Sequence, residues 1–162
     1  MMPAFRRVVL GALILLSLTA CSRKEDVLSR EEQLEYELAS SLQAALAYDE
    51  VCNKSEYVIG RNANLLGNLQ MVPARAFIAS ANNHHGDDLD ALSEKMLTLF
   101  VMTKDDMTAQ LQKDGCQSKT ADKAAHALAF FVTTPPEKAY AMTDDKLREL
   151  GITPAPRNPD LK

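Results

Sequence analysis

The sequence predicts an all-α protein, a small bundle of four to five helices with one disulfide. Three observations predict this fold class. The strong apolar periods repeat every three to four residues, which is the spacing of a helix face. No run alternates apolar and polar residues as a half-buried strand does. The connections between the periods are short, as they are in helix bundles.

The first 20 residues have the layout of a secretory signal peptide. Arg6 and Arg7 precede an eleven-residue apolar core, residues 8–18, and charged residues follow from Arg23 onward. A membrane-spanning helix needs about 20 apolar residues, so this run is too short for an uncleaved anchor. We therefore expect residues 1–20 to be removed.

A four-residue motif, Leu-Thr-Ala-Cys, closes this segment at residues 18–21. The motif resembles the lipobox of bacterial lipoproteins. The resemblance implies that Cys21 becomes the lipidated first residue of the mature chain, with acyl chains on its thiol and its amino group. Two or more acyl chains anchor a protein stably, whereas one does so only reversibly. Because Ser22 rather than Asp follows the cysteine, the resemblance implies a lipid anchor on the periplasmic face of the outer membrane.

The composition of the mature chain excludes some classes of partner. Without residues 1–20 the chain keeps 142 residues, with 16 Lys and Arg against 22 Asp and Glu, a net charge of −6. This length suffices for one domain with a real core. An acidic chain without a basic cluster does not suit nucleic acid, because that binding neutralises many phosphates. With no Trp, a carbohydrate-stacking platform is poorly supplied.

Two cysteines remain in the mature chain besides Cys21. Cys52 and Cys116 make an even number in an oxidising compartment, which predicts a disulfide. No Cys-x-x-Cys spacing is present, so a structural bridge is favoured over a redox pair. Closing a loop of about 65 residues stabilises a fold by roughly 4 kcal/mol in the chain-entropy model.

The helical domain is predicted over residues 29–151, after a short lipidated tether at residues 21–28. Ser29 and Glu32 have the spacing of a capping box, so a helix is expected to begin there. An apolar stripe carries this helix to about Val51.

The region after Cys52 is less regular, because glycines and asparagines are frequent there. We expect a short helix over residues 62–71. Pro73 suits a first helical turn and therefore predicts a second short helix over residues 74–81. A polar turn follows at residues 82–88.

The longest predicted helix covers residues 88–113 and ends at Gly115. Its apolar stripe is long enough to form part of the core and part of a groove for a partner. The candidate groove residues are Leu89, Leu92, Met96, Phe100, Met107 and Leu111.

Two further helices are predicted near the carboxyl terminus. Thr120 is the expected cap of the first, which Pro135 and Pro136 stop. Thr143 is the expected cap of the second, which covers residues 144–150 and ends at Gly151. Residues 152–162 are proline-rich and are expected to form an extended tail.

The residue types that carry chemistry gather at one place only. His84 and His85, followed by Asp87, offer imidazole and carboxylate groups to a metal ion. Adjacent histidines usually point apart, and the helical zinc motif places them four residues apart, so a solvated turn is favoured. No nucleophile elbow, phosphate-binding glycine loop or pair of catalytic carboxylates is present. The sequence therefore predicts a protein that is not an enzyme and has no cofactor.

These observations predict a protein that acts by binding. A short helical lipoprotein with one long-range disulfide resembles the pilotins of type II secretion, which hold a segment of the outer-membrane secretin. The resemblance rests on the architecture and on Cys52 and Cys116, and it involves no sequence motif; the last helix and the tail depart from it. We expect a membrane-anchored accessory or assembly factor that binds a protein of an envelope complex. The alternative is a periplasmic lipoprotein that binds a small ligand or a metal.

Overall fold

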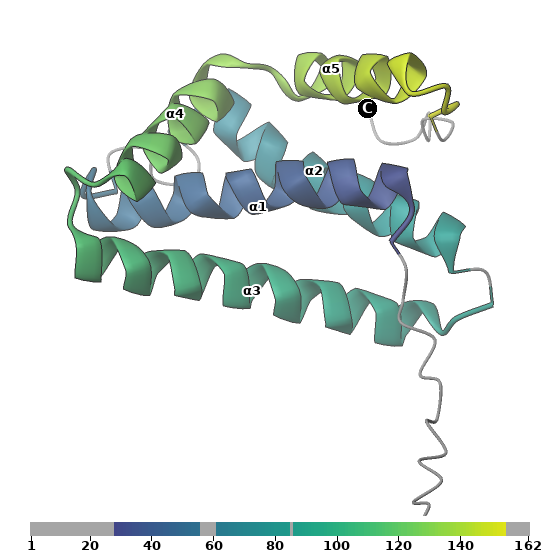
Figure 1. The fold of residues 1–162 in the computed structure, drawn as a ribbon, viewed down its shortest axis with the longest axis horizontal. Coiled ribbons are helices and arrows are strands. Elements are labelled where there is room, and N and C mark those ends of the chain that lie inside the picture. Colours follow the sequence, from purple (N-terminus) through teal and green to yellow (C-terminus); the bar gives the residue numbers. More distant parts are fainter. Residues whose placement is uncertain (1–27, 56–60, 85, 155–162) are drawn as a thin grey trace, which may run out of the picture.

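The computed structural model describes residues 28–55, 61–84 and 86–154, and it confirms the all-α class (Figure 1). Within these residues there are five helices and no strands. The helices are α1 (Arg30–Val51), α2 (Ala63–Asn83), α3 (Leu89–Asp114), α4 (Lys119–Thr133) and α5 (Pro136–Glu149). No helix in this part of the chain is both long and apolar enough to span a membrane.

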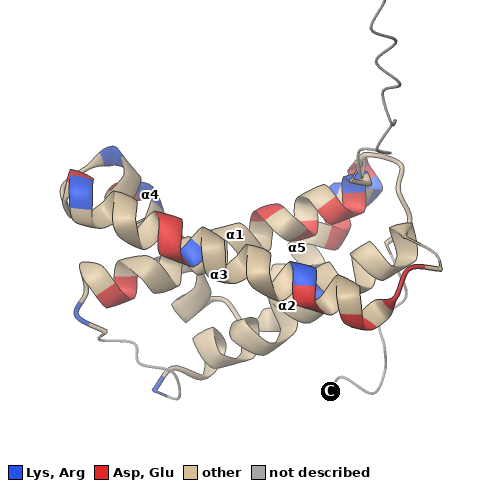
Figure 2. Ribbon diagram, turned by 90° about the horizontal axis from the view of Figure 1, so that it is seen from below, with Lys and Arg blue, Asp and Glu red and all other residues tan. Residues whose placement is uncertain are grey.

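The helix α1 is the centre of the bundle. The helices α2, α3 and α4 pack on it from different sides, and α1 and α3 run in the same direction while α2 runs back between their ends (Figure 1). The helix α3 lies on the outside of the bundle, and none of the other described helices covers the side of α3 that faces away from α1 (Figure 2). Small side chains in α1, such as the fully buried Ala39 and Ala45, let the neighbouring helices approach closely. The largest core cluster is formed by Ala39, Leu42, Ala45, Leu65, Val72, Ala76, Met96, Phe100, Leu128, Phe131 and Tyr140.

The predicted capping box at the start of α1 is present. The Ser29 hydroxyl accepts a hydrogen bond from the Glu32 backbone N–H at 3.1 Å, and a Glu32 carboxylate oxygen accepts one from the Ser29 N–H at 2.8 Å. Two of the free N–H groups of the first turn are satisfied in this way.

The helix α2 corrects the prediction of two short helices, because it is continuous from Ala63 to Asn83 with Pro73 inside it. Its amino-terminal cap is Asn62, whose side chain accepts from the Leu65 N–H at 2.8 Å. Proline removes one backbone hydrogen bond from a helix interior. Here Val72 and Ala76, on either side of Pro73, are both fully buried, so the packing of this face outweighs that loss.

The starts of α4 and α5 also differ from the prediction. Ser118 rather than Thr120 caps α4, and its hydroxyl accepts from the Ala121 N–H at 3.1 Å. The helix α5 begins at Pro136, eight residues before the predicted start, because a proline that stops one helix also fits the first position of the next. Thr143 is therefore a buried interior residue, and its hydroxyl donates to the Ala139 carbonyl at 3.3 Å.

The predicted end of the last helix is correct. Gly151 has a φ of 75°, in the left-handed region that favours glycine. Its N–H donates to the Arg148 carbonyl at 2.9 Å, and the Ile152 N–H donates to the Leu147 carbonyl at 2.9 Å. This pair of bonds is the Schellman motif, which satisfies carbonyls at the end of α5.

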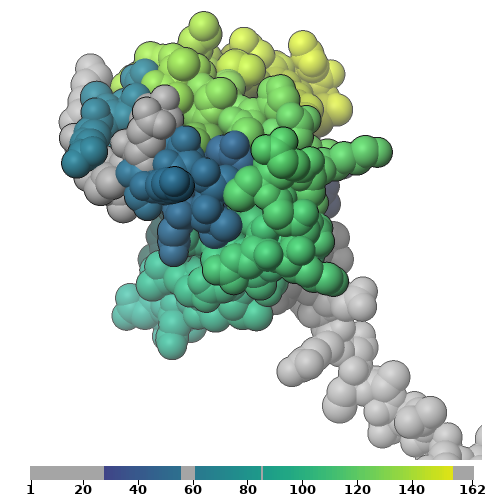
Figure 3. Space-filling model, turned by 90° about the vertical axis from the view of Figure 1, so that its left-hand side faces the viewer, coloured from purple at the N-terminus to yellow at the C-terminus, as the bar shows by residue number. Residues whose placement is uncertain are grey.

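The predicted disulfide between Cys52 and Cys116 is present, with the two Cα atoms 5.6 Å apart. It joins the end of α1 to the connection between α3 and α4, at the end of the bundle shown in Figure 3. A second small cluster, formed by Ala47, Leu111 and Ala121, lies in this part of the core. The disulfide and this apolar cluster therefore both hold α1, α3 and α4 together at this end of the bundle.

Candidate partner-binding site

A groove lies where α1, α3 and α4 meet. Because α3 and α4 pack far more on α1 than on each other, one side of α1 remains open between them. The groove has a volume of about 320 Å³. It is lined by Ser41 and Ala44 from α1, Met107 from α3, and Lys119, Thr120, Lys123, Ala124 and Ala127 from α4.

The groove combines an apolar lining with a positive edge. Ala44, Ala124 and Ala127 are small, so another side chain has room to approach the helix backbones. Lys119 and Lys123, one turn apart on α4, are both exposed. An apolar groove with a charged edge is the arrangement that accepts an amphipathic helix or an extended apolar segment.

The residues predicted to line the groove are divided between the core and the surface. Leu92, Met96, Phe100 and Leu111 are buried within the chain itself, so they do not form an open wall. Met107 lines the groove, and Leu89 is 55% exposed at the start of α3. The apolar stripe of α3 is used mainly to pack against α1, since the nearest apolar element covers such a face first.

The lining residues from α1 and α4 were missed by the sequence reasoning. Lys119, Lys123, Ala124 and Ala127 carry no local sequence signal of a site. The groove results from the separation of α3 and α4 across α1. Local periodicity does not report such a separation.

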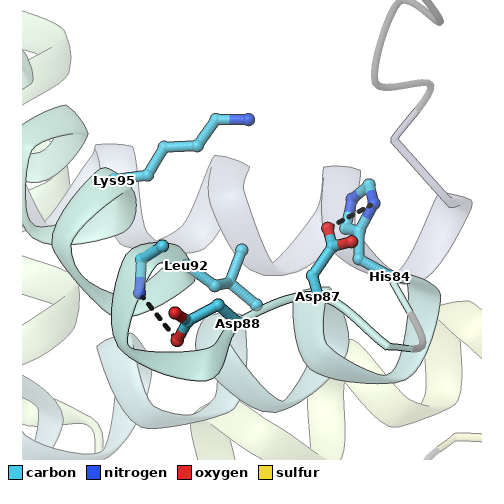
Figure 4. Close-up of a pocket in the computed structure, with 6 residues that line it drawn as sticks. His84, Asp87, Asp88, Leu92 and Lys95 are labelled. Carbon is cyan, nitrogen blue, oxygen red and sulfur yellow. Dashed lines mark hydrogen bonds and ion pairs between the residues drawn. The ribbon is translucent and has the colours of Figure 1, made fainter.

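His84 lies beside a second, smaller cavity of about 200 Å³ (Figure 4). Its Nε2 is 3.1 Å from Glu32 Oε1, so the ring donates to this carboxylate, and its Nδ1 is 4.0 Å from Asp87 Oδ2. The Asp88 carboxylate is occupied as the cap of α3, where it accepts from the Asp90 N–H at 2.9 Å. These side chains are used to fasten the turn before α3.

No group of three or more His, Cys, Asp or Glu side chains is placed to hold a metal ion in residues 28–55, 61–84 and 86–154. His85, the second candidate ligand, lies outside the described residues. The hydrogen bond of His84 is made to Glu32, which is fully buried in the bundle.

Glu32 is the centre of a buried polar network at the start of α1. Its carboxylate accepts from the Ser80 hydroxyl at 2.8 Å and also from the side chains of Asn83 and His84. Since the single Ser80 proton is donated to Glu32, the Tyr36 hydroxyl is the donor to Ser80 at 2.5 Å. The first turn of α1, which follows the predicted tether, is therefore fixed to the last turn of α2.

A second buried network joins α1, α2 and α5 through Arg75. Its Nε and Nη2 donate to Glu35 Oε1 at 2.9 and 2.5 Å, and Nη2 also donates to Asp144 Oδ1 at 2.6 Å. The guanidinium carbon lies 4.7 Å from the centre of the Tyr140 ring. Burial raises the pKa of Glu35, although the neighbouring Arg75 opposes this. These groups are central to the fold of α5 and do not line either cavity.

Cys21, the predicted lipidation site, lies outside the described residues, as do the signal peptide and most of the tether. No protein-family model, curated protein or solved structure matches this chain.

Proposed function

We propose that this protein is a non-catalytic accessory or assembly factor that binds a partner protein of an envelope complex in the groove between α1, α3 and α4. The groove is the single observation that carries this proposal. Its small apolar residues and its lysine edge suit an amphipathic segment with an acidic side chain. The residues of the two buried polar networks do not line the groove.

The resemblance of residues 18–21 to a lipobox supports a cellular location for this binding. A mature chain that begins at a lipidated Cys21 would be held at the periplasmic face of the outer membrane. The tether at residues 22–28 would extend to about 25 Å at most. Since the Glu32 network fixes the start of α1, the helical domain would stay close to the membrane surface.

A pilotin-like role is the narrower form of this proposal. Pilotins are small helical lipoproteins that hold a secretin segment, and the chain resembles them in its helices and its disulfide. The alternative of a small-ligand protein is less favoured. Pockets for drug-sized ligands usually measure about 300–1,000 Å³ and enclose the ligand, whereas the His84 cavity is smaller and the groove is open.

Photo-crosslinking in intact cells tests the proposal. A photoreactive amino acid replaces Ala127, which lines the groove, or Ala129, which is exposed on another side of the same helix. We expect the probe at position 127 to capture one defined segment of an envelope protein, and the probe at position 129 to capture none. Equal capture from both positions, or a purified chain that carries a small molecule in the groove, would overturn the proposal.

A further inference from the structure

The helix α3 has a second apolar face, which points away from the bundle. Leu97, Val101 and Met102 are 65%, 51% and 57% exposed, and Thr98 between them is exposed as well. We call these four residues the outer α3 stripe. They follow the i, i+1, i+4, i+5 spacing of a single helix face. Large apolar side chains grouped on an exposed surface mark an interaction site.

The outer α3 stripe is separate from the groove. Leu92, Met96 and Phe100, on the opposite face of α3, pack into the core. None of the four stripe residues lines the groove or the His84 cavity. The stripe is the uncharged middle part of α3 in Figure 2, with charged residues before and after it.

Both ends of the stripe are acidic. Glu94 precedes it by one turn and Asp105 follows it by one turn, and both side chains are exposed. Eleven residues separate the two, which is three helical turns, so they lie on the same side of α3 about 16 Å apart along the axis.

The other charged residues near the outer α3 stripe leave its two ends with a net negative charge. Asp90 and Asp106 add to the acidic ends, and Lys95 and Lys104 oppose them. Lys104 is already paired with Glu50 of α1, so it neutralises a charge on another helix. An apolar surface with an acidic group at each end is complementary to a segment with the opposite charges.

This charge pattern decides between three possible occupants. In an antiparallel pair of α3 helices centred on the stripe, Glu94 of one copy would meet Asp105 of the other, and a parallel pair would place each acid against itself. Like charges at an interface are unfavourable, so a second copy does not fit. The negative surface of a membrane leaflet is disfavoured for the same reason.

We propose that the outer α3 stripe binds an amphipathic helix of a partner protein, with an apolar centre and a Lys or Arg at each end. The two cationic residues of that helix are about eleven residues apart, so that they reach Glu94 and Asp105 together. This site is distinct from the groove. The protein thus has two binding faces, and it bridges two segments of a complex.

Two synthetic helical peptides test this site against the purified full chain, with fluorescence anisotropy as the readout. Both carry leucines on one face over two turns; one has Lys at positions eleven residues apart, and the matched control has Glu there. We expect the chain to bind the Lys peptide roughly tenfold more tightly than the Glu peptide. The double variant Glu94→Lys with Asp105→Lys should reverse this preference, and Met102→Glu should remove binding of both peptides.

Four results would overturn the site. Equal affinity for the two peptides, or no binding, would show that the acidic ends do not select the occupant. Loss of Lys-peptide binding in Ala127→Glu but not in Met102→Glu would place the peptide in the groove. Dimers in sedimentation that Met102→Glu abolishes would identify a second copy as the occupant. Glu94, Met102 and Asp105 are exposed, so their substitutions are expected to leave the fold unchanged. Ala127 is partly buried against the core, so circular dichroism and urea unfolding of Ala127→Glu establish that this variant is folded before its binding is compared.

Discussion

Arg75 joins three helices through one guanidinium group. It contacts the carboxylates of Glu35 on α1 and Asp144 on α5, which are 1% and 4% exposed, and it stacks on the ring of Tyr140. Two buried carboxylates share this single cation, and Glu35 Oε2 has no hydrogen-bond partner among the described residues. A buried carboxylate that is only partly satisfied binds a proton more tightly than an exposed one.

The variant Glu35→Gln tests this arrangement through pH. The folded chain holds the Glu35 proton more tightly than the unfolded chain, because burial raises the pKa of Glu35. The stability linked to this group is therefore complete below its ordinary pKa and is lost as the pH rises through the raised value. Glu35→Gln lacks this titration. As the pH rises, the free energy of unfolding of the wild type should therefore fall relative to that of Glu35→Gln.

Urea unfolding between pH 4 and pH 7 measures this difference. The matched control is Glu37→Gln, which removes an exposed carboxylate of the same helix two residues away. We expect the pH dependence of Glu37→Gln to follow that of the wild type. A Glu35→Gln curve parallel to the wild type across this range would show that Glu35 does not titrate differently in the folded state.

At the scale of the elements, local signals predicted the helices whose ends carry capping groups. The Ser29–Glu32 box and the end at Gly151 were both correct. The single helix through Pro73 was missed, because the buried face that continues across the proline is formed by packing on other helices. The early start of α5 was missed because the proline pair was taken only as a stop, whereas Pro136 is the first residue of the next helix.

The contact between α2 and α5 depends on Gly67. A Cβ atom at this position would lie 2.6 Å from Pro136 Cγ, closer than atoms can pack. Alanine favours a helix over glycine by about 1 kcal/mol, but overpacking costs about 1–3 kcal/mol, so Gly67→Ala should destabilise the fold.

Thermal and urea unfolding measure the effect of Gly67→Ala. The double variant Gly67→Ala with Pro136→Ala removes the clashing ring atom, and it should be more stable than the sum of the two single changes predicts. Strict additivity would show that Gly67 and Pro136 do not interact.

The Cys52–Cys116 bridge fastens α1 to the connection between α3 and α4. The three helices next to this bridge, α1, α3 and α4, all contribute residues to the groove. The double variant Cys52→Ser with Cys116→Ser should lower the free energy of unfolding by about 2–4 kcal/mol, because the unfolded chain regains its freedom. Urea unfolding with and without a reductant measures this loss of stability. The reductant should lower the free energy of unfolding of the wild type and leave that of the double variant unchanged. A wild type that is insensitive to the reductant would contradict it.

At the scale of the whole molecule, the predicted lipid anchor would decide where the proposed binding at the groove and at the outer α3 stripe takes place. Metabolic labelling with palmitate should mark the wild type, and the variant Cys21→Ser should lose the label because it has no thiol to acylate. Ser22→Ala is the matched control and should keep the label. A label that persists on Cys21→Ser would exclude the lipobox.

The sequence alone predicted the fold class and the disulfide, but most of the candidate site was beyond its reach. Periodicity identified the apolar face of α3, and packing then buried Leu92, Met96 and Phe100 against the rest of the bundle. The open side of α1 depends on the angle at which α3 and α4 cross it, and such angles follow from the packing of many side chains. A small residue such as Ala127 therefore gave no signal of a site before its neighbours were known.

Partner recovery with two matched variants tests whether the groove between α1, α3 and α4 holds a protein partner. Ala127→Glu places a charge in the groove, whereas Ala129→Glu makes the same change on an exposed side of the same helix. The chain is purified from detergent-solubilised envelopes, and the co-purifying proteins are quantified by mass spectrometry. We expect Ala127→Glu to reduce recovery of one envelope protein about tenfold or more, with Ala129→Glu equal to the wild type. Unchanged recovery with Ala127→Glu, in a chain that remains folded, would contradict the claim.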